Sequence, residues 1–298
     1  DLRRVLERRA QLNDAIRRFF RERGFLEVET PVVLPANAPE ANIDAVPAGT
    51  GWIRTYPELA MKRLLAAGCE KIFQLGPVAR AGEHGRWHHP EFALLEWYRA
   101  HAGYLEILAD AKALLACVAR EIRGATDFAW QGRPLSCAQE LWEKSTVSEA
   151  FLQHAGWDPA QRFDADRFDL DLVTRVEPAL PPDHPVVLID YPAPLAALAR
   201  RKPGDPLRAE RWELYLGGVE LANAYSELTD PAEQRARFEE ANAQRVRRGA
   251  PPYPLDEAFL AALAQMPPSG GIALGVDRLL MILADAASLD DVLPFRHG

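Results

Sequence analysis

Two strand-like segments, residues 72–80 and 91–99, constrain the fold most, because only a polar, histidine-rich loop, residues 81–90, separates them. Strands joined so directly pair antiparallel, since a parallel pair needs a longer crossover connection. Residues 212–228 repeat the arrangement, with a turn at Gly217-Gly218 between two further strand-like runs. Hairpins mixed with helices predict an α+β fold whose sheet is mostly antiparallel.

Helical patterns surround these strands, with apolar residues recurring every three or four positions. The predicted helices are residues 2–23, 57–68, 104–123, 231–248 and 276–284, and further strands are expected at 25–31, 185–191 and 270–274. Residues 127–184 show no clear pattern and are expected to add helices and loops over the sheet. No linker is evident, so residues 1–298 are expected to form a single domain.

Charge and cysteine content exclude several classes of protein. Lys and Arg number 35 and Asp and Glu 43, a net charge of −8, which disfavours wrapping of a large RNA. The arginines of residues 235–237 and 245–248 lie among glutamates and are interpreted as a solvated helix face. Three cysteines without a CxxC pair argue against a disulfide framework or a zinc ribbon. Without a signal peptide or membrane-spanning run, the cytoplasm is the expected location.

The second strand of the long-looped hairpin carries a chemically suggestive face. Alternate residues of a strand share a face, which groups Phe92, Leu94, Glu96 and Tyr98. An aromatic ring can stack on a base, a carboxylate can meet an ammonium, and Arg80 at the end of the partner strand can meet a phosphate. The alternative is a core strand whose Glu96 is neutralised by a structural arginine.

Glu220, Asn223 and Glu227 form a second candidate group, with oxygen ligands suited to Mg²⁺. The spacing of the two glutamates puts them on opposite faces of an ideal strand, so they converge only if a bulge or the strand end intervenes. Otherwise they are two solvent-exposed glutamates.

A third group joins the small-residue strand at residues 270–274 to a helix whose first turn contains Arg278. Small residues allow a ligand to approach the backbone, and a helix start can face an anion. Neither a Walker A loop nor a Gly-x-Gly-x-x-Gly fingerprint is present. His84, His88 and His89 in the hairpin loop fit a phosphate-facing loop better than a zinc site.

In order along the chain, these segments resemble the three signature motifs of class II aminoacyl-tRNA synthetases. Residues 24–31 are similar to the first motif, Arg80 to Glu96 to the second and Ala273 to Arg278 to the third. The resemblance extends through nearly the whole chain and is strongest to the lysyl-tRNA synthetase branch. No segment is left for an anticodon-binding domain, so the chain is most similar to the free-standing elongation factor P–(R)-β-lysine ligases, with motifs at residues 61–68, 94–99 and 218–230.

The resemblance implies a site for ATP, Mg²⁺ and lysine or (R)-β-lysine. Arg80 and Arg278 would be catalytic, with Arg80 on the α-phosphate and Arg278 on the adenine or the γ-phosphate, and Phe92 would stack on adenine. The implied ATP-binding residues are Arg80, Glu83, His89, Phe92, Glu220, Leu221, Gly275 and Arg278. The implied amino-acid-binding residues are Tyr56, Glu58, Glu96, Tyr98, Asn223, Glu227 and Ala273. Glu220 and Glu227 would bind Mg²⁺ or the substrate amine. Ala273 stands where the ligases have Ala and the synthetases usually have Gly.

Three departures from both families fall in the same site. The second motif begins Arg80-Ala81-Gly82, with Glu83 one place later than the usual glutamate. His89 replaces an asparagine, and Tyr56 replaces the serine of the ligases. These changes affect the placement of ATP and the choice of amino acid.

The resemblance implies an ATP-dependent ligase that forms an aminoacyl adenylate, releases pyrophosphate and transfers the amino acid to a lysine of elongation factor P. It also implies a homodimer built through the first motif. Two alternatives stay open: a related enzyme that acts on tRNA or another acceptor, which the net charge disfavours, and a non-catalytic nucleotide-binding paralogue.

Overall fold

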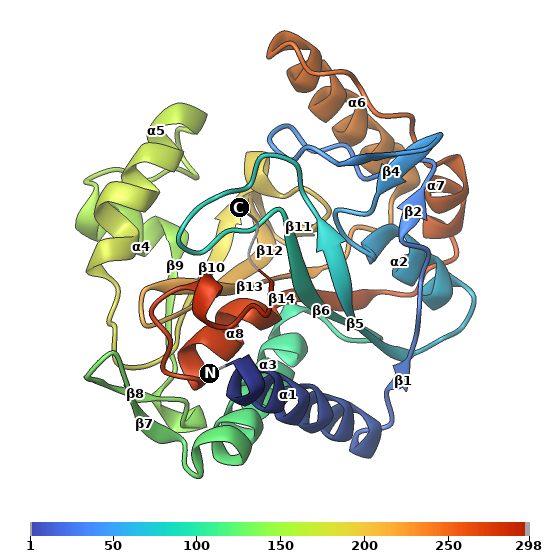
Figure 1. Cartoon of the computed structure of the whole chain (residues 1–298). Coiled ribbons are helices and arrows are strands. Elements are labelled where there is room, and N and C mark those ends of the chain that lie inside the picture. The colour runs from blue at the N-terminus through green and yellow to red at the C-terminus, as the bar shows by residue number, and fades with distance from the viewer. Residues whose placement is uncertain (1, 296–298) are drawn as a thin grey trace.

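The computed structural model describes residues 2–295 and centres on a nine-stranded sheet (Figure 1). Its strands are β1 (Leu26–Glu27), β5 (Lys71–Ala79), β6 (Glu91–Ala100), β9 (Glu143–Thr146), β10 (Val186–Pro192), β11 (Arg201–Lys202), β12 (Asp205–Leu216), β13 (Val219–Ser226) and β14 (Ser269–Gly275). The order is β1-β5-β6-β14-β13-β12-β10-β9, with β11 beside β12. All pairs are antiparallel except β1 with β5 and β9 with β10. The predicted α+β class is confirmed.

Helices cover one face of this sheet. The helices of the chain are α1 (Leu2–Glu22), α2 (Glu58–Ala66), α3 (Tyr104–Arg123), α4 (Val147–His154), α5 (Ala165–Asp171), α6 (Pro231–Arg247), α7 (Glu257–Leu263) and α8 (Val276–Leu283). Among them, α1, α3 and α8 lie together on one face (Figure 1), where Phe20, Trp97 and Ile107 join one buried core. Burying this apolar face drives the packing, because each large side chain removed from water contributes about 1.5–3 kcal/mol.

The other face carries two separate groups of helices. Leu59 of α2 and Phe259 of α7 share one apolar cluster, with α6 alongside, while α4 and α5 pack over β10 around Phe151 and Phe168. These two groups lie far apart in Figure 1. The middle of the face, formed by β6, β14 and β13, is therefore free to line a pocket.

Local signals in the sequence explain most element boundaries. Asp230 caps α6 by accepting hydrogen bonds from the first backbone N–H groups of the helix, and Gly124 ends α3 at φ +80°. Gly217 and Gly218 make the β12–β13 turn at φ +63° and +78°, values that favour glycine. The predicted hairpins and helices are confirmed, with end shifts of a few residues.

Five expectations need correction. The strand expected at 25–31 shrinks to β1, and β12 begins at Asp205 rather than 212. The unclear stretch 127–184 contains a hairpin of its own, β7 (Asp127–Trp130) and β8 (Arg133–Ser136), and it also supplies β9 to the main sheet. Helix α7 was not anticipated. A small sheet of β2 (Val33–Leu34), β3 (Pro47–Ala48) and β4 (Gly51–Ile53) fills the expected loop before α2.

The interpretation of residues 245–248 as a solvated face is wrong for Arg245. This side chain is 1% exposed, and it donates hydrogen bonds to the carbonyls of Glu40, Ile43 and Pro251 and to Asp44. The alternation of charges along α6 concealed one arginine that points inward. No helix within residues 2–295 combines the length and apolar character needed to cross a membrane.

Candidate active site

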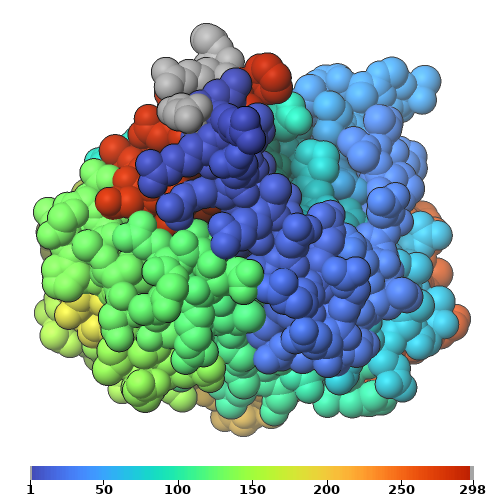
Figure 2. All heavy atoms as spheres, turned by 60° about the horizontal axis from the view of Figure 1, so that its bottom comes forward, coloured from blue at the N-terminus to red at the C-terminus, as the bar shows by residue number. Residues whose placement is uncertain are grey.

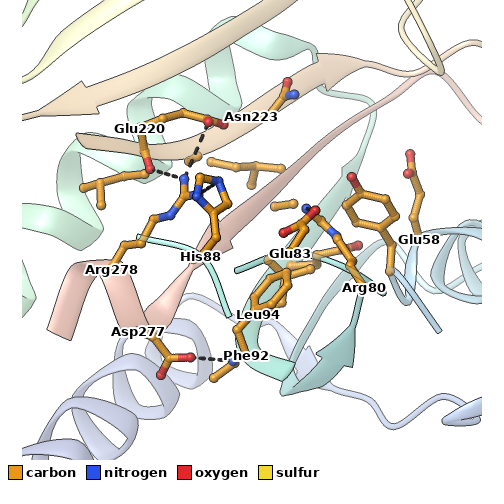
Figure 3. A pocket seen from close by; sticks show the side chains of 18 of the residues that line it. Glu58, Arg80, Glu83, His88, Phe92, Leu94, Glu220, Asn223, Asp277 and Arg278 are labelled. Atoms are coloured by element: carbon orange, nitrogen blue, oxygen red, sulfur yellow. Dashed lines mark hydrogen bonds and ion pairs between the residues drawn. The ribbon is translucent and has the colours of Figure 1, made fainter. Parts of the chain in front are cut away.

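One pocket on the open face of the sheet gathers all the residues predicted for the site (Figure 3). Those lining it are Tyr56, Glu58, Arg80, Glu83, His89, Phe92, Glu96, Tyr98, Glu220, Leu221, Asn223, Glu227, Ala273, Gly275 and Arg278. They come from α2, the β5–β6 hairpin, β13, β14 and the start of α8. The pocket therefore depends on segments distant in the sequence, although the individual roles stay predictions.

The alternating pattern of β6 operates as expected. Phe92, Glu96 and Tyr98 line the pocket, whereas Leu95 and Trp97 enter the core beneath the sheet. Glu96 is 1% exposed and accepts a hydrogen bond from the Tyr98 hydroxyl at 2.8 Å. The alternative, in which a structural arginine neutralises Glu96, is wrong, because Glu96 forms no ion pair with an arginine of residues 2–295.

Three buried carboxylates and one ammonium form the end of the pocket nearest α2. Lys62 Nζ lies 2.6 Å from Glu58 Oε1 and 2.5 Å from Glu227 Oε2, and Glu96 lies beside them. Burial raises the pKa of Glu96 well above its usual range, and it raises that of Glu227 to about 8 although Lys62 opposes the shift. This excess of carboxylates, which we call the amine end, suits a cationic ligand.

Lys62 was missed by the sequence reasoning. It lies one helical turn after Glu58, so the two side chains share a face of α2. An i,i+4 pair of opposite charge normally indicates an exposed helix surface, and nothing in the spacing showed that this face is buried. Its pKa is raised, because Glu227 and Glu58 outweigh the burial that acts to lower it.

Gly271 allows the amine end to close. A Cβ at this position would lie 2.2 Å from Tyr98 Cε1 and 2.4 Å from Glu227 Oε1. No real side chain tolerates such contacts, so only glycine lets the ring of Tyr98 and the carboxylate of Glu227 approach across β14. The expectation that small residues here allow a ligand to approach the backbone stays a prediction; at Gly271 the groups that approach are the protein's own.

A bulge in β13 places Glu220 and Glu227 on the same face, although their spacing would put them on opposite faces of an ideal strand. Across from β12, Leu214 pairs with Ala222 but Tyr215 pairs with Glu220, so Leu221 is an extra residue. One inserted residue reverses the alternation before it. Glu220 therefore shares the pocket face with Asn223 and Glu227, and the two glutamates are not merely solvent-exposed.

Arg278 is fixed at the opposite end of the pocket from Lys62. Its guanidinium donates to the carbonyls of Trp87 (3.0 Å) and Glu220 (2.7 Å), contacts His88 Nε2 at 2.8 Å and lies 3.5 Å from the Glu220 carboxylate (Figure 3). These contacts hold an exposed loop against the first turn of α8. We call this region, with Gly275 at the helix start, the phosphate end.

Asp277, next to Arg278, ties the phosphate end to the core. Its carboxylate accepts a hydrogen bond from the Ala93 backbone N–H at 2.8 Å and pairs with Arg9 of α1 at 2.6 Å. The first turn of α8 is therefore fixed to both β6 and α1. His89 is 8% exposed and pairs with Asp290 at 3.0 Å, which joins the hairpin loop to the C-terminal segment.

Arg80 lies between the two ends. Its guanidinium carbon is 4.4 Å from the centroid of the Tyr56 ring and 4.9 Å from that of Phe92. Glu83 reaches it at 3.5 Å, because Gly82 turns the chain at φ +78° and so absorbs the extra residue before Glu83. The late glutamate therefore still enters the pocket, and Tyr56 stacks on Arg80.

The phosphate end offers hard oxygen donors for a divalent cation. Burial, with Glu213 as the next cause, raises the pKa of Glu220 to about 7. The Asn223 side-chain oxygen is buried without a hydrogen-bond partner in residues 2–295, and its amide nitrogen lies 3.4 Å from Glu213. Mg²⁺ commonly binds one or two carboxylates together with substrate phosphates, and Glu220 with the Asn223 oxygen fits that pattern. Glu213 is engaged instead by Arg211 and by the hydroxyls of Tyr191 and Tyr215. Glu213 was not anticipated, because it lies on the neighbouring strand.

Comparison with known proteins places this geometry in a family. The family model described as tRNA synthetases class II (D, K and N) matches residues 1–297. The elongation factor P–(R)-β-lysine ligase of Erwinia tasmaniensis is 40% identical, over 97% of this chain and 94% of that protein. The protein of the same name from Haemophilus influenzae strain KW20 is also 40% identical, over 97% and 93%. The lysine–tRNA ligase of Moorella thermoacetica is 36% identical, over 99% of this chain but 65% of its own length. The chain belongs to the class II tRNA synthetase family.

Proposed function

We propose that this class II synthetase relative activates lysine or (R)-β-lysine with ATP and transfers it to a lysine side chain of elongation factor P. The observation that carries the proposal is a single pocket with an acidic amine end, a phosphate end that holds Arg278, and Arg80 between them. Such a pocket binds a diamino acid at one end and ATP at the other. The names of the most similar relatives support elongation factor P as the acceptor.

The first step is attack of the amino-acid carboxylate on the α-phosphorus of ATP, which expels pyrophosphate. Arg80 lies between the two ends, where it neutralises the α-phosphate, and Arg278 holds the leaving pyrophosphate. No side-chain nucleophile is needed, because catalysis here consists of positioning and charge neutralisation. Phe92, whose ring lies 4.9 Å from the Arg80 guanidinium carbon, offers that ring to adenine.

Recognition of the amino acid takes place at the amine end. Glu58, Glu96 and Glu227 surround the substrate ammonium groups, and Tyr98 orients Glu96. Of the two roles open to Glu227, its ion pair with Lys62 favours the amine. Ala273, next to Glu96 and Asn223 across the sheet, limits the depth of the pocket.

Glu220, together with the Asn223 side-chain oxygen, would hold Mg²⁺. The ion supplies charge neutralisation for the ATP phosphates. Glu220 also fixes Arg278 through its backbone carbonyl, so the arginine stays in place at the phosphate end.

The chain acts as one catalytic domain, residues 1–298, and forms a homodimer through its first motif. Figure 2 shows the residues of α1 and of the segment after it, in blue, across one face of the molecule. Leu2, Leu6, Leu26, Val32 and Val33 are exposed there. Exposed apolar side chains along α1 and the segment after it support burial against a second copy. Sedimentation equilibrium tests the dimer, and a mass near one chain contradicts it.

Amino-acid-dependent ATP–pyrophosphate exchange tests the activity, run with α-lysine, (R)-β-lysine and a panel of other amino acids. Exchange with a lysine isomer is the expected result. Incubation of the charged enzyme with elongation factor P and, separately, with tRNA then identifies the acceptor. Binding of ATP with no exchange for any amino acid would identify a non-catalytic paralogue.

A further inference from the structure

Glu40 is a pocket residue that none of the sequence motifs included. It lies in the loop between β2 and β3 and lines the same pocket as Arg80 and Glu58. Its backbone carbonyl accepts a hydrogen bond from Arg245. Its carboxylate, in contrast, has no hydrogen bond and no ion pair with any residue of the described range 2–295.

Glu40 shares the pocket with charged residues from both ends of the site. Arg80 is the charge that acts on it most strongly, followed by Glu58. This inference rests on the proposed function, in which Arg80 binds the α-phosphate and Glu58 binds the substrate amine. The acyl carbon of an adenylate joins these two groups, and Glu40 lines the pocket that would hold both of them.

The other carboxylates of the pocket are already engaged. Glu58 and Glu227 pair with Lys62, and Glu96 accepts from Tyr98; all three are at most 7% exposed. Glu83 pairs with Arg80, and Glu220 lies at the phosphate end beside Arg278. Glu40 is partly exposed, so it can exchange protons with solvent.

Arg245 holds the Glu40 loop in place from behind. This buried side chain of α6 donates to the carbonyls of Glu40 at 3.0 Å and Ile43 at 2.8 Å and pairs with Asp44 at 2.8 Å. A loop fixed by several hydrogen bonds presents its side chain in a defined place before substrate arrives, as a catalytic group requires.

We propose that Glu40 is the general base of the transfer step, which deprotonates the side-chain ammonium of the acceptor lysine. The carboxylate takes one proton from that ammonium. The neutral nitrogen attacks the acyl carbon of the adenylate, the bond from that carbon to the phosphate oxygen breaks, and AMP leaves with the electron pair. The second proton of the nitrogen passes to solvent as the amide forms, and Glu40 then releases its own proton to solvent.

The electrostatic surroundings suit this task. Burial raises the pKa of Glu40 to about 7, with Glu58 and Glu83 adding to the shift and Arg80 and Arg211 opposing it. Tyr56 and Tyr225, the other titratable groups near it, have pKa values raised above their usual range, mainly by burial, and so stay neutral. A base with a pKa near the working pH is the most effective.

The test compares two nucleophiles on the enzyme-bound adenylate in single turnover. Nα-acetyl-lysine methylamide, like the lysine of elongation factor P, must lose a proton before it attacks. Hydroxylamine is already unprotonated near neutral pH. Glu40→Gln should slow reaction with the lysine amide and with elongation factor P at least about a hundredfold. The rate reduction for hydroxylamine should be smaller than this by a factor of at least about ten. Glu91→Gln, an exposed carboxylate at the start of β6, is the matched control.

The pH dependence supplies a second measurement. In the wild type, the transfer rate to the lysine amide should rise with pH through about 7 as Glu40 loses its proton. In Glu40→Gln that rise should disappear, whereas Glu40→Asp should retain it at a reduced rate. Equal losses for both nucleophiles, or an unchanged pH profile, would overturn the role of Glu40. A wild type that forms no adenylate would overturn the proposed function itself.

Discussion

Lys62 of α2 and Glu227, the residue after β13, form a buried ion pair with 2.5 Å between Nζ and Oε2. This pair links a helix to the centre of the sheet at the amine end. Glu58, one turn earlier on the same helix, also pairs with the Lys62 ammonium. Within residues 2–295, the Lys62 ammonium is the only cation that pairs with the buried carboxylates of the amine end.

At a pH above about 8, where Glu227 is ionised, replacing Lys62 by methionine should lower the free energy of unfolding by about 3–5 kcal/mol, because it leaves buried carboxylates without their counter-charge. Urea denaturation measures the change. The double variant Lys62→Met/Glu227→Gln should recover part of the loss, since it removes one orphaned charge. A single-variant loss under about 1 kcal/mol would mean that water or protonation compensates fully.

The pH dependence of stability follows from Glu227. Its pKa is raised from 4.5 to about 8, chiefly by burial, so the folded state favours the neutral acid. The stability that this group contributes is therefore present below pH 4.5 and lost as the pH rises through about 8. The melting temperature of the ligand-free enzyme should fall over this interval. Glu227→Gln should flatten the decline, and added lysine should stabilise the wild type more at the alkaline end. A decline of equal slope in both proteins would contradict the assignment.

Arg80→Ala should reduce lysine-dependent pyrophosphate exchange at least about a hundredfold, because it removes a preorganised donor to the α-phosphate. Arg86→Ala is the matched control. It lies in the same hairpin loop, but its side chain is exposed and outside the pocket, so exchange should stay within about threefold of the wild type. Near-normal exchange in Arg80→Ala would remove Arg80 from the mechanism.

Gly271→Ala should damage amino-acid binding more than ATP binding. The new Cβ would displace Tyr98 and Glu227, and we expect KM for lysine to rise at least about tenfold, in line with the loss of one well-made polar contact. Steady-state exchange with each substrate varied in turn separates the two effects. Gly85→Ala is the control, since its Cβ would meet only His88 at 3.8 Å. Equal increases in both KM values would indicate general disruption.

The spacing of apolar residues was sufficient to predict those helices and strands that bury one face. The pocket face of β6 follows from alternation, and the core helices α1, α3 and α8 follow from their apolar spacing. Contacts between distant segments escaped this reasoning. Glu40 lies in an irregular loop, and the inward direction of Arg245 depends on that loop packing against α6.

The site itself shows the same limit. Family motifs brought all the predicted residues to one pocket, but Lys62 and Glu213 carry no motif signal of their own. Lys62 matters because a helix face is buried, and Glu213 because β12 lies beside β13. Neither fact can be obtained from local spacing.

The bulge at Leu221 makes the number of residues in β13 a functional property. If Leu221 entered the regular ladder, Glu220 would lie an odd number of positions before Asn223 and its carboxylate would turn to the far side of the sheet. Loss of Leu221 itself would leave Glu220 two positions before Asn223, and so on the pocket face. Among relatives, the spacing between these two residues should therefore be either three positions with a bulge or two without one. Other insertions and deletions should accumulate in the 81–90 loop, where Gly82 already absorbs one.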